Sequence, residues 1–232
     1  MIKNSIFWEK TYKKNLKSQR NFPNEELCRF LGRNYKNKKK INVLELGCGT
    51  GSNINAFIHH NMNITGIDIS KESIKICKKK YKLKKQIQFL NLDMLEINKI
   101  SKKFDLIVDI FSTYNLNLKE NEKLLELIHM KLKNKGIFFC YTPSKNSTSW
   151  KKEKDKFDES TLKSFKRKVS PYFGNKGFFR FSSLTEIKNR LKKNSFKIDY
   201  SEIVSRTYNS TKEYFEFIVI EAKKSNDKKY YK

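Results

Sequence analysis

The chain has 232 residues, a length that fits one α/β domain with a single hydrophobic core and an insertion. No stretch approaches the ~20 apolar residues of a membrane span, and the N-terminus lacks the apolar core of a signal peptide, so the sequence predicts a cytoplasmic protein. The four cysteines lack the spacing of a zinc site or a disulfide framework, which predicts reduced thiols and no metal. The net charge of +27 comes with 44 lysines and only 7 arginines, and the chain also has 23 asparagines and two alanines. This composition is typical of A- and T-rich codons, so the charge is weaker evidence for a dedicated nucleic-acid surface.

The first 40 residues are expected to form a helical cap. Aromatic residues gather in a short helical segment around Trp8 and Tyr12, Pro23 marks a turn, and a second helix opens at Asn24. Apolar residues at positions 27, 30 and 31 give this second helix one buried face. The segment therefore precedes the core and folds over it.

From position 42 to 142, strand and helix patterns alternate. Strands are predicted at 42–47, 63–69, 86–92, 104–110 and 136–142, and helices at 51–60, 71–83 and 119–133. Strands that alternate with helices imply right-handed crossovers, a parallel sheet and helices on both of its faces.

The alternation stops between 143 and 181, where aromatic residues stand among many lysines without a clear period. We expect an insertion that caps a ligand pocket; a surface excursion that packs its rings on the sheet is the alternative. A capping box from Ser183 to Glu186 opens the last helix, and strands at 196–207 and 214–222 close the sheet. A disordered tail is expected at 223–232.

The most informative segment is the loop at 47–51, with the sequence Gly-Cys-Gly-Thr-Gly, which follows the first strand and Glu45. Three of the 8 glycines of the chain lie in this loop, and glycine tolerates positive φ and the close approach of a ligand to bare backbone. A dinucleotide fingerprint needs glycine at the position of Ser52, and a Walker loop needs Gly-Lys-Ser or Gly-Lys-Thr. The loop therefore indicates a cofactor site of another type.

Acidic residues stand at the carboxyl ends of the next three strands. Asp68 lies about twenty residues beyond the loop, the spacing at which a carboxylate accepts hydrogen bonds from a ribose. Asp93 has two interpretations, a ligand contact or the N-cap of a helix that begins at Met94. Asp109 likewise either serves the reacting groups or acts as a structural cap.

This series of motifs resembles class I S-adenosylmethionine (SAM)-dependent methyltransferases. The resemblance implies an α/β fold with a Rossmann-like sheet of seven strands, the last one antiparallel. It implies an N-terminal helical cap at 1–40 followed by a methyltransferase domain at 41–222. It also implies SAM as the methyl donor and S-adenosylhomocysteine (SAH) as the product. The cofactor contacts that it implies are Glu45, Gly47, Cys48, Gly49, Asn53, Asp68, Ile69, Asp93, Met94, Asp109, Trp8, Tyr12 and Arg20.

A narrower resemblance is carried by Trp8, Tyr12, Arg20 and Asn53 together with the glycine loop. These positions are similar to those of small-molecule methyltransferases of bacterial surface-glycan and nucleotide-sugar pathways. The resemblance implies methyl transfer to an O or N atom of a small anionic acceptor such as a nucleotide sugar, whose phosphates lysines would suit. Ile110 departs from it, because those relatives often carry arginine there.

Methyl transfer is an in-line displacement, in which a protein aligns the reactants and excludes water. A hydroxyl acceptor also needs a base, and the candidates just past the fourth strand are Asp109 and Tyr114. The motifs of base-N6 and cytosine-C5 methylation are absent from the sequence. An RNA methyltransferase and a SAM-binding partner subunit without turnover stay open as alternatives, and nothing in the sequence indicates the oligomeric state.

Overall fold

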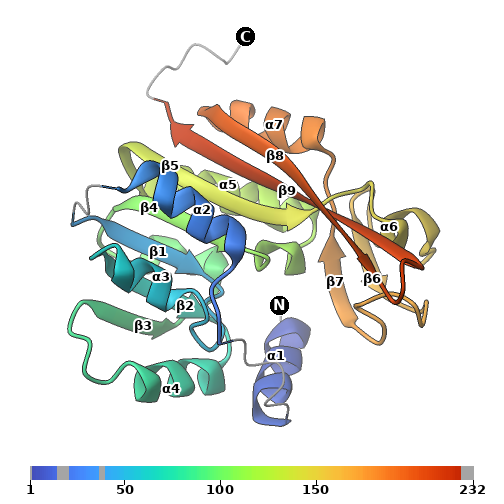
Figure 1. Ribbon diagram of the computed structural model, residues 1–232, viewed down its shortest axis with the longest axis horizontal. Helices are drawn as coiled ribbons and strands as arrows, with labels where there is room; N and C mark the ends of the chain where they lie inside the picture. The colour runs from blue at the N-terminus through green and yellow to red at the C-terminus, as the bar shows by residue number, and fades with distance from the viewer. Residues whose placement is uncertain (1, 15–20, 37–39, 226–232) are drawn as a thin grey trace.

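The computed structural model describes residues 2–14, 21–36 and 40–225. Its centre is a seven-stranded sheet with the strand order β3-β2-β1-β4-β5-β9-β8 (Figure 1). The strands are β1 (Asn42–Leu46), β2 (Asn63–Asp68), β3 (Ile87–Asn91), β4 (Phe104–Ile110), β5 (Leu132–Pro143), β8 (Phe196–Tyr208) and β9 (Glu213–Lys224).

Strand direction confirms the predicted sheet. Neighbouring strands from β3 to β5 are parallel, whereas β9 is antiparallel to both β5 and β8. This is the Rossmann-like arrangement expected of a class I methyltransferase sheet with its last strand antiparallel. Strand β9 continues to Lys224, two residues into the predicted tail, and residues 226–232 lie outside the described part of the chain.

Helices cover both faces of the sheet (Figure 1). On one face lie α2 (Glu25–Asn34), α3 (Ile54–His59) and α4 (Lys71–Lys80), and on the other lie α5 (Leu118–Lys131) and α7 (Leu184–Lys193). Because successive strand residues point to opposite faces, Val43 packs in the hydrophobic core under α2, α3 and α4, whereas Leu44 packs in the core under α5 and α7. The predicted capping box at Ser183 and Glu186 is confirmed at the start of α7.

The N-terminal helix α1 (Ile2–Lys14) docks beside the start of α4. The Glu9 carboxylate accepts hydrogen bonds from the Ser70 hydroxyl at 2.7 Å and from the Glu72 backbone N–H at 3.2 Å. A carboxylate at a helix N-terminus is favoured by the unpaired N–H groups and the helix dipole there. This docking carries Trp8 and Tyr12 to the carboxyl edge of the sheet.

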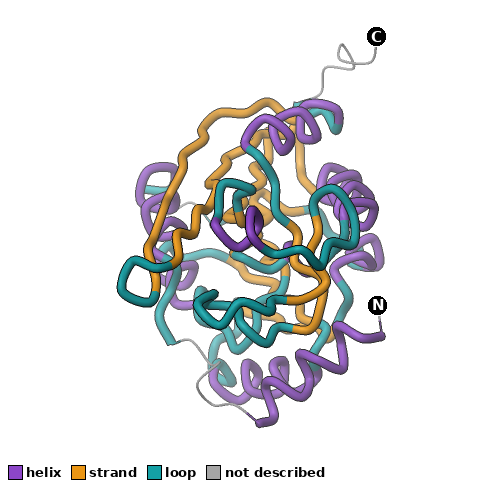
Figure 2. The backbone as a smooth tube through the Cα atoms, turned by 90° about the vertical axis from the view of Figure 1, so that its right-hand side faces the viewer, coloured by secondary structure: helices purple, strands orange, loops and turns teal. Residues whose placement is uncertain are grey.

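The insertion at 143–181 is more regular than the sequence pattern predicted. It contains α6 (Thr148–Lys152) and an antiparallel pair, β6 (Thr161–Ser164) and β7 (Lys176–Arg180). In Figure 2 it faces the viewer, and α1 runs below it. Strand β7 packs against the short helix η3 (Thr113–Asn115), which follows β4, so the insertion lies over the carboxyl ends of the parallel strands.

Two negative findings concern the described residues alone. No helix among them is both long and apolar enough to cross a membrane. Cys28, Cys48, Cys77 and Cys140 are free thiols, in agreement with the expectation of unpaired cysteines.

Candidate functional site

The glycine loop between β1 and α3 adopts a backbone that other residues rarely reach. Gly47, Gly49 and Gly51 have φ values of 63°, 53° and 80°. Left-handed backbone costs an L-residue roughly 1–2 kcal/mol, which is why glycine recurs at alternate positions here. The loop thus exposes bare backbone at the end of β1.

Asp68 at the end of β2 holds this loop. Its Oδ2 atom accepts a hydrogen bond from the Gly49 N–H at 2.9 Å, and Oδ1 accepts one from the Ser70 N–H at 2.9 Å. Burial raises the pKa of Asp68 although these hydrogen bonds oppose the shift. A carboxylate accepts about four hydrogen bonds, and the Ser73 side chain is a third partner of Asp68, so one position remains on a side chain that lines a pocket, and it suits a ribose hydroxyl.

Replacing Asp68 by alanine is expected to weaken SAH binding about 30-fold, or about 2 kcal/mol, because a charged acceptor and the anchor of Gly49 are both lost. Calorimetric titration with SAH measures the effect, and circular dichroism checks the fold. Asp199→Ala is the matched control, since Asp199 on β8 forms only loose ion pairs, at 3.9 Å with Lys197 and 3.7 Å with Lys223. Equal affinities in the two variants would remove Asp68 from the site.

Glu45 is buried beneath the loop. Its Oε1 atom accepts a hydrogen bond from the Asn53 side-chain amide at 2.7 Å, and Asn53 Oδ1 accepts one from the Asn24 backbone N–H at 2.9 Å. The other oxygen, Oε2, is buried without a hydrogen-bond partner among the described residues. Because Glu45 also lines a pocket, this oxygen fits a polar group of a ligand.

The pH dependence of stability tests the state of Glu45. Burial raises its pKa from 4.5 to about 8, against the Asn53 hydrogen bond and in the same direction as the nearby Asp68 charge. The folded state therefore keeps a proton that the unfolded chain releases above pH 4.5, and this contribution to stability is lost as pH rises toward 8. Between pH 5.5 and 7.5, urea unfolding should show wild type losing about 2 kcal/mol relative to Glu45→Gln. Parallel pH profiles of the two proteins would show that Glu45 is ionised throughout.

Two pockets open beside the loop and share Trp8, Tyr12, Gly47 and Phe111. The first pocket is also lined by predicted cofactor residues from the ends of β2 and β3, namely Asp68, Ile69, Asp93 and Met94. The second pocket is also lined by Glu45, Cys48, Gly49, Asn53 and Tyr114. The structure thus gathers the predicted residues around two adjoining pockets, except Arg20, which lies outside the described residues, and Asp109.

Asp93 combines the two interpretations that its sequence position allowed. Its Oδ1 atom accepts a hydrogen bond from the Leu95 N–H at 2.9 Å, so it is the N-cap of η2 (Met94–Lys99). The same residue lines the first pocket. Asp93 is therefore fixed by its capping bond at the edge of the pocket.

Asp109 lies behind the site and lines neither pocket. Its Oδ1 atom accepts hydrogen bonds from the N–H groups of Ser112 and Thr113 at 3.0 Å each, and Oδ2 accepts one from the Thr113 hydroxyl at 2.5 Å. Burial raises the pKa of Asp109, and these hydrogen bonds oppose the shift. This placement favours the structural cap over contact with the cofactor or the acceptor.

Phe111 and Arg206 were missed by the sequence interpretation, whereas Tyr172 and Phe173 belong to the insertion that was expected to cap a ligand pocket. Phe111 has a φ of 53°, an unusual conformation for a bulky residue, and its ring centroid lies 4.4 Å from that of Tyr114. Tyr172, Phe173 and Arg206 also line the second pocket, although they come from the insertion and from β8. An aromatic residue just past the fourth strand was the only sequence signal for Phe111, because its backbone conformation depends on the fold.

Comparison with known sequences matches residues 43–136 to the methyltransferase domain family. Over 120 residues the chain is 33% identical to the ubiquinone biosynthesis O-methyltransferase of Pelagibacter ubique, an alignment that covers 48% of this chain and 46% of that protein. The chain therefore spans about half the length of this curated relative.

Comparison with solved structures extends over most of the chain. A SAM-dependent methyltransferase of Methanosarcina mazei is similar with a TM-score of 0.68 and 18% identity, covering 85% of this chain and 98% of that one. The magnesium protoporphyrin IX methyltransferase of Synechocystis PCC 6803, solved with bound SAM, is similar with a TM-score of 0.61 and 14% identity, covering 87% and 77%. At these identities the likeness establishes the fold.

Proposed function

We propose that the chain is a class I SAM-dependent methyltransferase that transfers the methyl group of SAM to an O or N atom of a small-molecule acceptor. The observation that carries the proposal is that the two pockets adjoin, since Gly47 and Phe111 line both. These residues follow β1 and β4, where ligands bind in open α/β sheets. The first pocket suits the donor nucleoside, and the second leads from the glycine loop to an acceptor.

Bound SAM supplies a methyl group on a positively charged sulfur. The task of the chain is then to bind, to orient the acceptor and to exclude water. Asp68 offers an acceptor position for the ribose, and Glu45 offers a buried carboxyl oxygen for a polar group of the cofactor. Trp8 and Tyr12 from α1 contribute to the walls of both pockets, and Tyr114 is the predicted catalytic residue that lines the second.

The acceptor class is the less defined part of the proposal. A nucleotide sugar, the expectation from the sequence, carries two phosphates, whereas Arg206 is the one lysine or arginine among the described residues that line either pocket. The residues that line the pockets therefore support a small-molecule acceptor with little negative charge. Nucleotide sugars remain one arm of the experiment.

Two measurements on the full chain test the proposed function. Calorimetry should detect SAH binding, and a SAM-dependent assay for SAH formation should respond to a small-molecule panel that includes nucleotide sugars and phenols. Incorporation into total RNA that falls steeply with salt would instead favour an RNA methyltransferase. SAH binding without turnover on any substrate would favour a partner subunit, and absence of SAH binding would overturn every SAM-dependent role.

A further inference from the structure

The second pocket has strongly aromatic walls. Rings come from α1, from the segment after β4 and from the insertion, including Trp8, Tyr12, Phe111, Tyr114, Tyr172 and Phe173. Aromatic walls favour flat ligands, because offset stacking and edge contacts add roughly 0.5–1.5 kcal/mol per ring pair beyond the area buried. The composition of the pocket thus bears on the shape of the acceptor.

Phe111 stands at the junction of the two pockets. Its left-handed backbone is held by the Phe111 N–H, which donates to the Tyr141 carbonyl at 2.9 Å, and its ring lies 5.6 Å from the Tyr172 ring, centroid to centroid. A bulky residue in this conformation stores strain, and such strain gathers at functional sites. The fold therefore keeps an aromatic face where the donor and acceptor pockets meet.

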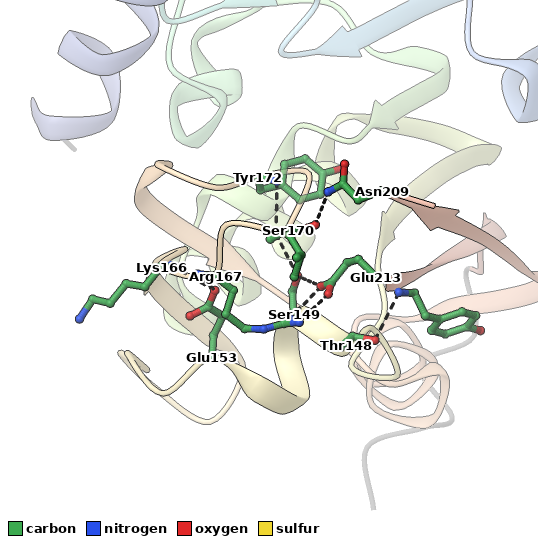
Figure 3. Close-up of polar contacts among 11 residues, drawn as sticks. Thr148, Ser149, Glu153, Lys166, Arg167, Ser170, Tyr172, Asn209 and Glu213 are labelled. Carbon is green, nitrogen blue, oxygen red and sulfur yellow. Dashed lines mark hydrogen bonds and ion pairs between the residues drawn. The ribbon is translucent and has the colours of Figure 1, made fainter. Parts of the chain in front are cut away.

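The far wall of the second pocket is anchored by a buried polar network (Figure 3). Glu213 is 0% exposed. Its Oε1 atom accepts hydrogen bonds from Arg167 Nη1 at 3.0 Å and from the Ser149 hydroxyl at 2.6 Å. Its Oε2 atom forms an ion pair with Arg167 Nη2 at 2.8 Å. The Ser170 hydroxyl lies 3.1 Å from that of Ser149 and accepts a hydrogen bond from the Tyr172 N–H at 3.3 Å. The network fixes the backbone of Tyr172 and so preorganises this wall.

Charge in the second pocket is sparse for a chain with 44 lysines. Among the described lining residues no lysine appears, Arg206 is the basic side chain, and Glu25 and Glu45 are the acidic ones. A ligand with several phosphates needs several cationic partners. The pocket instead matches a ligand with one acidic group at most.

Resting on the methyl transfer proposed above, the geometry points to a planar aromatic or heteroaromatic acceptor that stacks on Phe111 between α1 and the anchored Tyr172 wall. Such a ring places a hydroxyl or amine substituent at the junction of the pockets. A single carboxylate on the far side of the ring faces Arg206.

Binding to SAH-loaded protein tests this acceptor class without requiring the natural substrate. The probes are 2-naphthol, 6-hydroxy-2-naphthoate, 3,4-dihydroxybenzoate and UDP-glucose, titrated calorimetrically. At least one aromatic probe should bind with a Kd on the order of 1 mM or tighter, and UDP-glucose should bind more weakly. The inference is overturned if no aromatic probe binds, or if UDP-glucose binds more tightly than the aromatic probes. The proposed function itself is overturned if the wild-type protein does not bind SAH.

Three leucine variants locate the bound ring. Phe173→Leu should weaken the aromatic probe about 3- to 10-fold while SAH affinity stays within about twofold, because Phe173 lines the second pocket alone. Phe111→Leu should weaken the aromatic probe by a similar factor, and this probe is titrated at saturating SAH because Phe111 also lines the first pocket. Phe173 is 54% exposed, so its replacement leaves the fold intact should Phe111→Leu prove unstable. Phe157→Leu is the control, because Phe157 is an exposed insertion residue outside both pockets. An equal loss in the control would overturn the assigned position.

Arg206→Gln tests the acidic group. The variant should weaken 6-hydroxy-2-naphthoate about threefold and leave 2-naphthol unchanged, since an exposed ion pair contributes at most about 1 kcal/mol. Equal effects on the two probes would remove the carboxylate from the inference.

Discussion

Asp109→Ala is expected to lower the free energy of unfolding by about 4 kcal/mol. The change removes the acceptor of two backbone N–H groups and of the Thr113 hydroxyl, all in a fully buried position. Each buried donor left without a partner costs about 1–3 kcal/mol. Urea unfolding measures the loss, and the accompanying fall in activity should follow from displacement of η3, which carries Tyr114.

Asp109→Asn separates the cap from a catalytic base. The amide oxygen still accepts from the two N–H groups, and the Thr113 hydroxyl can turn to accept from the amide nitrogen, so the expected loss is about 1 kcal/mol with turnover retained. Asp105→Asn on the same strand is the control; the partly exposed Asp105 accepts from the Asn42 N–H and pairs with Lys133. Full stability with abolished turnover in Asp109→Asn would restore Asp109 as the base.

Gly47→Ala is expected to reduce SAH affinity at least about 100-fold. A Cβ atom at Gly47 would lie 1.8 Å from Ser112 Oγ and 2.8 Å from Ser112 Cβ, and the φ of 63° is unfavourable for alanine. The backbone conformation costs roughly 1–2 kcal/mol and overpacking a further 1–3 kcal/mol. Because Gly47 and Ser112 both line the first pocket, relief of the clash must displace one of its walls.

Two further variants separate the steric clash with Ser112 from the backbone strain at Gly47. Gly47→Ala combined with Ser112→Gly removes the clash but keeps the backbone strain, so it should recover part of the affinity. Gly32→Ala is the matched control: Gly32 lies in α2 with nothing within 4 Å of an added Cβ, and the change should stabilise the helix by about 0.5–1 kcal/mol. Wild-type SAH affinity in Gly47→Ala would show that the loop tolerates a side chain and does not contact the cofactor.

The parallel part of the sheet could be predicted from the sequence because its signals are local. Apolar runs predicted β1, β2, β3 and β4 to within a residue or two. The loop at 47–51 and Asp68, both predicted from the sequence as cofactor residues, are joined in the structure by the hydrogen bond from Gly49 to Asp68. Local signals also predicted the caps at Asn24 and Ser183.

The insertion was expected to cap a ligand pocket, but the contacts that build the second pocket could not be predicted, since they join distant parts of the chain. Arg167 and Glu213 are paired across 46 positions, and Arg180 reaches the Thr113 hydroxyl across 67. Neither pairing has a periodic pattern, and the β6–β7 hairpin is too short to produce one. Likewise, the left-handed conformation of Phe111 follows from the pairing of β4 with β5 and leaves no mark on the sequence.

The segment that matches the family model and the segments that flank it build different parts of the site. The matched family region ends at residue 136, within β5, whereas Tyr172, Phe173 and Arg206 come afterwards and Trp8 and Tyr12 come before. The matched segment supplies the carboxyl ends of β1, β2 and β3, and the flanking segments supply most of the opposite wall of the second pocket. A change confined to the residues after β5 would therefore reshape the second pocket while leaving the glycine loop and Asp68 in place.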